Sequence, residues 1–110
     1  MKISHVHLSF LDLKSAIQWM KVLLNKEPGY QNDGMAVFSF ENIDYVFDNG
    51  NSDTEVTIAL VSKNCESDFQ SLSQRGVETV ELPTAQPWGV KTAYLKGPGK
   101  VTFEIEESLK

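Results

Sequence analysis

The hydrophobic pattern of this chain changes period twice in the same order, and this repeat is the strongest constraint on its fold. Residues 3–10 alternate between apolar and polar side chains, as a half-buried strand does. Residues 13–24 then carry apolar side chains at helical spacing. Alternation returns over residues 55–61, and residues 64–76 give a second helical pattern. The chain therefore repeats one order of elements.

The two repeats share a register. Asp12 and Asn64 both stand where a helix N-cap is expected, and they are 52 residues apart. The same offset places Thr57 opposite His5. Few residues are identical between the two halves, so the repeat is one of element order and hydrophobic phase.

Turn-forming residues and further alternating stretches complete each repeat. The most polar, turn-rich stretch, residues 48–53, separates two modules of about residues 1–50 and 53–110 within a single domain of residues 1–110. A strand, a helix and then antiparallel hairpins predict an α+β fold of two βαβββ modules, with a curved antiparallel mixed sheet around a cleft. The further strands are expected at residues 35–40, 43–47, 77–81, 89–95 and 100–105, with turns at Glu41-Asn42 and Gly97-Pro98-Gly99 and a loop bounded by Pro83 and Pro87.

The composition limits which binding partners and which cellular compartment we expect for this protein. The 110 residues include 15 acidic and 10 basic side chains, which give a net charge of −5 at pH 7. This charge repels phosphate backbones and anionic lipid headgroups, so we expect neither nucleic acid nor a membrane as a partner. Cys65 is the only cysteine, which excludes an intrachain disulfide and favours a reducing compartment. No apolar run has the length of a signal peptide or a membrane span, and we expect a cytoplasmic protein.

Alternation also places chemically useful side chains on one strand face. The apolar side chains of residues 3–10 suit the face beneath the helix, so His5 and His7 should point to the cleft. The same argument turns Glu104 and Glu106 toward the cleft from the last strand. Two histidines and a carboxylate are suitable donors for a divalent metal ion. Histidine and glutamate on the open face of a sheet can equally be ordinary solvated residues.

Aromatic side chains are further ligand-binding candidates. Trp88 follows a proline at the start of a strand, where its indole can be a packing lid or a stacking surface for a flat or cationic ligand. Tyr94 is a second candidate. Carboxylates around an aromatic wall favour a cationic or polar aromatic guest and binding that is sensitive to salt. The carboxylates that would form this acidic cup are those of Asp44, Glu55, Glu104 and Glu106.

Cys65 lies at the expected N-terminus of the second helix, a position that lowers a thiol pKa. Catalysis by this thiol would need a histidine partner. The histidines are expected on the sheet face away from the helices, so we interpret Cys65 as structural.

Two segments carry a resemblance to a known family. The first is residues 5–15, HVHLSFLDLKS, followed by the amphipathic helix. The second consists of Pro87-Trp88-Gly89, Gly97-Pro98-Gly99-Lys100 and Glu104-Ile105, which resemble a closing pattern of P-W-G, then D-P-x-G-N, then E-L/I, in order and spacing. Together with the paired modules, these segments resemble the glyoxalase, bleomycin-resistance and extradiol dioxygenase proteins, the vicinal oxygen chelate superfamily, over essentially the whole chain.

The resemblance implies metal ligands on the first and last strands of each module. His5 matches the first-strand histidine of the first module. Glu104 matches the last-strand glutamate of the second module, which the resemblance makes a ligand and a catalytic carboxylate. Thr57 and Val46 occupy the other two ligand positions. The implied metal set is therefore incomplete.

Other positions also depart from the family pattern. Gly97 stands where the family usually has aspartate, and Lys100 where it usually has asparagine. Two other residues could complete the set of metal ligands. His7 could join His5 and Glu104, or Glu55 could replace the missing ligand of the second module.

These observations favour a glyoxalase/bleomycin-resistance-like protein that binds a small molecule in the cleft between modules, without a complete metal site and with no cofactor. The alternative is a divalent-metal-dependent lyase, isomerase or dioxygenase acting on a substrate with vicinal oxygens. The resemblance also implies a homodimer, because the family commonly builds its clefts across paired modules. The candidate ligand-binding residues are His7, Trp88, Tyr94, Glu55 and Thr57.

Overall fold

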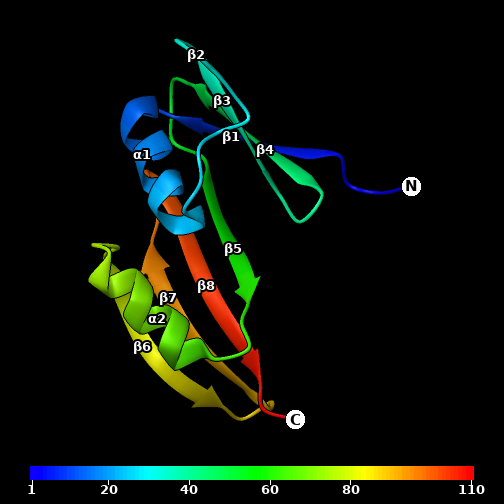
Figure 1. Ribbon diagram of the computed structural model, residues 1–110, viewed down its shortest axis with the longest axis vertical. Coiled ribbons are helices and arrows are strands. Elements are labelled where there is room, and N and C mark those ends of the chain that lie inside the picture. The colour runs from blue at the N-terminus through cyan, green and yellow to red at the C-terminus, as the bar shows by residue number, and fades with distance from the viewer. The chain divides into compact units, whose positions relative to one another are not determined.

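The computed structural model describes all 110 residues, which divide into two compact units, Met1–Thr54 and Glu55–Lys110. The units repeat one order of elements, as Figure 1 shows by label and colour. The α+β prediction is confirmed. The elements are β1 (His5–Phe10), α1 (Leu13–Leu24), β2 (Tyr30–Asn32), β3 (Met35–Phe40), β4 (Ile43–Asn49), β5 (Glu55–Val61), α2 (Cys65–Gln74), β6 (Thr79–Gln86), β7 (Val90–Lys96) and β8 (Lys100–Ser108).

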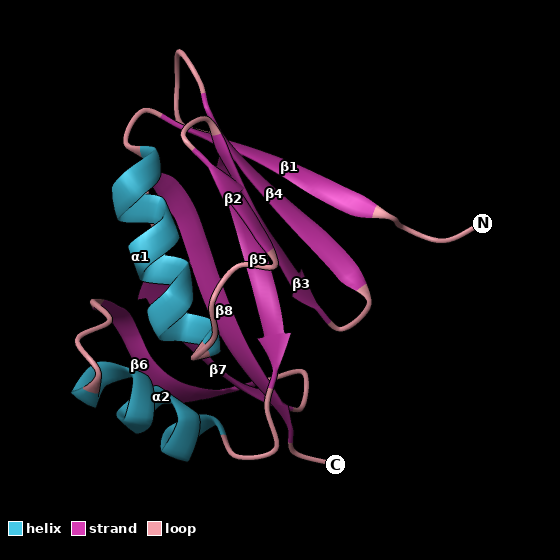
Figure 2. Ribbon diagram, turned by 45° about the horizontal axis from the view of Figure 1, so that its top comes forward, coloured by secondary structure: helices cyan, strands magenta, loops and turns pink.

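The first unit is a four-stranded sheet with strand order β1-β4-β3-β2. β1 pairs with β4 in parallel, and the other neighbours pair antiparallel. Helix α1 packs on one face of this sheet (Figure 2). Three phenylalanine rings form the centre of the core, with centroids 4.9 Å apart for Phe10 and Phe47 and 5.6 Å apart for Phe38 and Phe47. Burial of these rings is a main source of stability in a unit this small.

Local sequence sets the ends of α1. Asp12 is the N-cap, and its side chain accepts a hydrogen bond from the Ser15 backbone N–H at 3.1 Å. Asn25 ends the helix in the left-handed conformation, with φ of 53°. Glu41 and Asn42 join β3 to β4 with φ values of 52° and 64°, which is the conformation of a tight hairpin turn. These predicted boundaries are therefore confirmed.

The second unit repeats the architecture, with strand order β5-β8-β7-β6. β5 and β8 pair in parallel, and α2 packs on one face of the sheet. Asn64 caps α2 by accepting a hydrogen bond from the Ser67 backbone N–H at 3.0 Å. Gly76 follows the helix with φ of 93°, a conformation that favours glycine. The buried apolar side chains of this unit are Phe69, Leu72, Val77, Ala93, Leu95, Val101, Phe103 and Ile105, with Cys65.

The strands differ from the prediction at two places. The expected loop between Pro83 and Pro87 is wrong, because β6 continues through Pro83 to Gln86. Pairing between β6 and β7 shifts register between Thr79 and Glu81 and again between Glu81 and Thr84. A proline without an N–H is tolerated at such an irregular edge strand. The short strand β2 was not predicted as a separate element, since all three of its residues are exposed and it has no apolar alternation.

Candidate functional site

In each unit the helix covers one face of the sheet, and the other face, which carries no helix of that unit, is called the open face here. Residues paired in register lie on the same face, so the open face of the first sheet can be read from the pairing of β1 with β4. His5 pairs with Asp44, and His7 pairs with Val46. The prediction that His5 and His7 share this face is therefore consistent with the pairing.

The two histidines of the first unit are held by neighbouring polar side chains. Their ring centroids are 5.0 Å apart and the rings are inclined by 69°. Asp48 Oδ2 lies 3.5 Å from His7 Nδ1, and Ser9 donates a hydrogen bond of 2.7 Å to the other oxygen of Asp48. Ser4 Oγ lies 3.1 Å from His5 Nδ1. Each imidazole thus has one nitrogen facing a protein partner.

The open face of the second sheet brings an aromatic ring and carboxylates together. Tyr94 on β7 pairs in register with Glu104 on β8, and Thr92 pairs with Glu106. Glu81 on β6 pairs with Tyr94 from the other side. Thr92 is only 2% exposed although no helix covers this face, and its hydroxyl accepts a hydrogen bond of 3.0 Å from Gln86. Part of this face is therefore shielded from solvent.

The electrostatics of this face are dominated by its carboxylates. Burial raises the pKa of Tyr94 above its ordinary value, and the negative charge of Glu104 and a hydrogen bond to it raise this pKa further. The charges of Glu81 and Glu106 act in the same direction. The ion pairs of the structure involve other carboxylates: those of Asp48, Glu27, Glu66 and Glu78.

The donors for a metal ion do not gather within either unit. No group of three or more histidine, cysteine, aspartate or glutamate side chains that could hold a metal ion is present. His5 belongs to the first unit and Glu104 to the second. Val46 pairs with His7, so an apolar side chain stands where the family pattern has a ligand. The residues of each unit taken alone thus do not fit the metal centre that the resemblance implies, and no catalytic step is derived through it.

The remaining predicted residues lie at the edges of the second sheet. Trp88 is in the turn between β6 and β7 and is 68% exposed, so its interpretation as a packing lid is wrong. Glu55 and Thr57 lie on the exposed side of β5, which is an edge strand. Their parallel partners on β8 are Lys100 and Thr102. Tyr94, whose strand face was not predicted, is the aromatic residue that pairing places beside Glu104.

Cys65 is the first residue of α2 and is fully buried. Desolvation raises the pKa of its thiol, and the nearby charge of Glu107 raises it further. The expectation that the helix N-terminus lowers this pKa is therefore wrong, because burial outweighs position. Its interpretation as a structural residue agrees with this burial.

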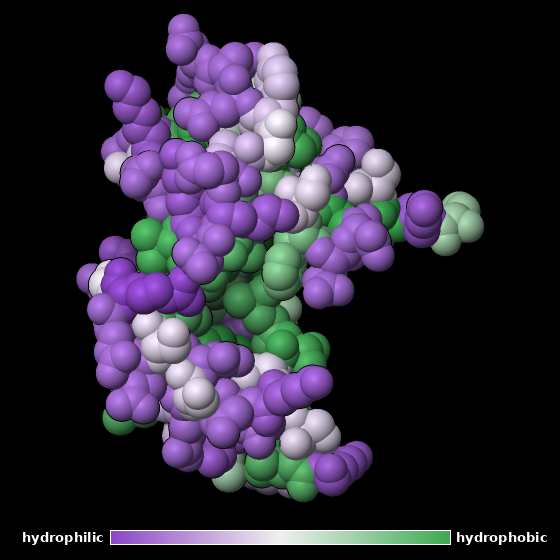
Figure 3. All heavy atoms as spheres, viewed as in Figure 1, coloured by the Kyte–Doolittle hydropathy of each residue, from purple (hydrophilic) through white to green (hydrophobic).

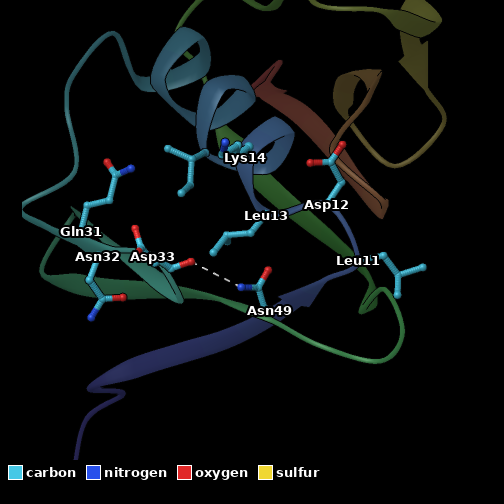
Figure 4. A pocket seen from close by; sticks show the side chains of 9 residues that line it. Leu11, Asp12, Leu13, Lys14, Gln31, Asn32, Asp33 and Asn49 are labelled. Carbon is cyan, nitrogen blue, oxygen red and sulfur yellow. Dashed lines mark hydrogen bonds between the residues drawn. The ribbon is translucent and has the colours of Figure 1, made fainter.

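A cavity that the sequence did not indicate lies at the N-terminus of α1. Its volume is about 480 Å³, and Figure 4 shows side chains of α1, β2 and the turn after it around it. Several of its polar groups are already used by the fold: Asn49 donates to the Asp33 carbonyl at 3.4 Å, and Asn32 Oδ1 accepts from the Gly34 and Met35 backbone N–H groups. The lining residues are Leu11, Asp12, Leu13, Lys14, Ile17, Gln31, Asn32, Asp33 and Asn49.

Hydrophilic side chains dominate the surface seen in Figure 3, with smaller hydrophobic areas between them. No helix of the structure is both long and apolar enough to cross a membrane. No protein-family model matches the chain, and no curated protein matches it significantly in sequence.

Solved structures, in contrast, share its fold over nearly the whole length. A glyoxalase/bleomycin resistance protein/dioxygenase from Nocardioides matches with a TM-score of 0.87 at 17% identity, over 100% of this chain and 85% of that chain. A lactoylglutathione lyase from Agrobacterium tumefaciens matches with a TM-score of 0.78 at 12% identity, over 96% and 92% of the two chains. A bleomycin resistance determinant encoded on the transposon Tn5 matches with a TM-score of 0.76 at 13% identity, over 98% of each chain. This chain therefore has the fold of the glyoxalase/bleomycin resistance/dioxygenase proteins.

Proposed function

We propose that the protein binds a small organic cation with an aromatic or apolar group, on the open face of the second sheet. The observation that carries this proposal is the position of Tyr94 among the three carboxylates of Glu81, Glu104 and Glu106. A phenol ring attracts a cation through its π face, and the surrounding carboxylates add Coulombic attraction. The half-buried position of Glu104 and Glu106 limits screening by water.

Proteins that share the fold also support the proposal that this protein binds a small molecule. One structural neighbour is described as a bleomycin resistance determinant, and other neighbours as glyoxalase/bleomycin resistance proteins. Binding by the second sheet needs no metal ligand. The metal-dependent lyase, isomerase or dioxygenase alternative needs a set of metal ligands, and the structure has no group of three or more histidine, cysteine, aspartate or glutamate side chains that could hold a metal ion. Small-molecule binding is therefore the function that the observed side chains support best.

The test is calorimetric titration of the full chain with benzyltrimethylammonium, benzyl alcohol and benzenesulfonate, which differ mainly in charge. We expect the cation to bind most tightly and its affinity to fall as salt is raised from low to high concentration. Glu104→Gln should weaken binding of the cation about fivefold, which corresponds to roughly 1 kcal/mol. Tyr94→Ala should weaken it by a similar factor.

Glu66→Gln is the matched control. It removes the same charge from the same unit, but Glu66 lies on α2 and pairs with Lys91 at 2.7 Å. Its binding should equal that of the unmodified protein. Equal affinity for all three probes, or equal loss in Glu66→Gln and Glu104→Gln, would contradict the proposal.

A further inference from the structure

The open face of the second sheet changes the sign of its charge along the strands. On β8, Lys100, Thr102 and Glu104 follow one another at every second residue, so their side chains project from one face about 6.6 Å apart. Lys96 on β7 pairs in register with Thr102 and lies two residues beyond Tyr94. The face therefore carries two lysines next to the β7–β8 turn, and carboxylates further along the strands around Tyr94.

Burial separates this face from the one that the helix covers. Val101, Phe103 and Leu95, which alternate with the polar residues of β7 and β8, are buried in the core. Lys96 and Lys100 are exposed. A ligand on the open face can therefore reach both ammonium groups from solvent.

Two carboxylates lie near these lysines. Glu78 Oε2 is 3.9 Å from Lys96 Nζ, and the two side chains are 70% and 61% exposed. Glu55 on β5 pairs in register with Lys100. Ion pairs between exposed side chains contribute little stability, so an anionic group of a ligand can replace these carboxylates with little loss.

Two hydroxyl groups lie between the charged ends of the face. Thr57 on β5 pairs in register with Thr102 on β8, in the row between Lys100 and Glu104. A hydroxyl group donates one hydrogen bond, and an anionic oxygen is a strong acceptor for it. The threonines can therefore donate to the same anionic group that the lysines attract.

We infer that the small molecule bound on this face is amphoteric, with its cationic group at Tyr94 and an anionic oxygen group, such as a carboxylate, at Lys96 and Lys100. The inference rests on the proposed function and adds a second charged group to that ligand. The carboxylates around Tyr94 repel a simple anion, and a simple cation uses only one end of the face. The two charged groups should lie roughly 6–7 Å apart, which is the distance of two residues along a strand.

The test is calorimetric titration of the full chain with benzyltrimethylammonium and with its carboxylated derivative (4-carboxybenzyl)trimethylammonium. The added carboxylate should raise the affinity about fivefold, because it gains contacts with the lysines. The isomer (2-carboxybenzyl)trimethylammonium holds its two charges closer together and should gain less.

The double variant Lys96→Gln/Lys100→Gln should remove the gain from the carboxylate. The same variant should bind benzyltrimethylammonium somewhat more tightly, because two positive charges are lost from the face. Lys14→Gln is the control, since Lys14 is an exposed lysine of α1 in the first unit, and it should keep the full gain. Circular dichroism verifies that each variant retains the fold.

The outcomes separate this inference from the proposed function. If neither benzyltrimethylammonium nor its derivatives bind, both are overturned. If benzyltrimethylammonium binds and the carboxylate adds nothing, or if the double lysine variant keeps the gain, only this inference is overturned. An equal gain for the two isomers would contradict the spacing on which it depends.

Discussion

At the scale of single residues, Cys65 shows that burial can affect a thiol pKa more strongly than a position at a helix N-terminus does. A helix N-terminus stabilises a thiolate, but this thiol is fully buried and donates a hydrogen bond of 3.7 Å to the Ile105 carbonyl. Desolvation therefore raises its pKa. The thiol should react with a disulfide reagent at pH 8 only after the protein is denatured.

An exposed cysteine provides the comparison for this prediction. Ser52 lies in the exposed turn that precedes β5, so Ser52→Cys should add one thiol that reacts at once in the native protein. A rapid reaction of Cys65 in the unmodified native protein would show that the thiol is accessible. That result would remove the argument for a purely structural role.

At the scale of elements, the turn between β7 and β8 explains one departure from the family pattern. Gly97 stands at the position where the family usually has aspartate. A Cβ atom added there would lie 2.7 Å from the Val101 carbonyl oxygen and 3.0 Å from the Phe103 ring. The backbone of Gly97 also donates to that carbonyl at 2.9 Å, so the turn closes tightly over a core ring. A side chain cannot enter without displacing the start of β8.

Gly97→Ala should therefore lower the free energy of unfolding by about 1–3 kcal/mol, the usual cost of overpacking. Urea denaturation measures this change. Gly34→Ala is the control, because its Cβ would meet nothing closer than the Asn32 side chain at 3.8 Å. A loss of stability that is no larger for Gly97→Ala than for Gly34→Ala would show that the turn can relax.

At the scale of the whole molecule, we propose that the protein forms a homodimer. The outer strand β6 of the second sheet has an unpaired edge, and its side chains Val80 and Leu82 are 63% and 69% exposed. An exposed apolar edge strand tends to pair with another chain. Light scattering coupled to gel filtration should give twice the chain mass of 12.3 kDa.

Substitution of the edge tests this proposal. Leu82→Lys should shift the protein toward the monomer, while Leu11→Lys, which is 64% exposed in the first unit, should leave the dimer intact. A single-chain mass at every accessible concentration would contradict the dimer. A dimer unchanged by Leu82→Lys would place the interface elsewhere.

The sequence by itself determined the features that depend on neighbours along the chain. The caps at Asp12 and Asn64, the hairpin at Glu41-Asn42 and the shared face of His5 and His7 follow from local hydrogen bonding and from the geometry of a strand. These interactions span only a few residues, so the pattern of residue types is enough to predict them. The same holds for the repeated order of elements, and hence for the fold class.

Only the tertiary structure decided the features that depend on residues far apart in sequence. Pairing of β6 and β8 with β7 surrounds Tyr94 with carboxylates, and packing against β8 buries Cys65 and leaves no space at Gly97. Strand register also shows that Asp48, which follows the predicted end of its strand, lies beside His7. Alternation gives the face of a side chain but not its neighbour across the sheet, because register is fixed by the sum of many distant contacts.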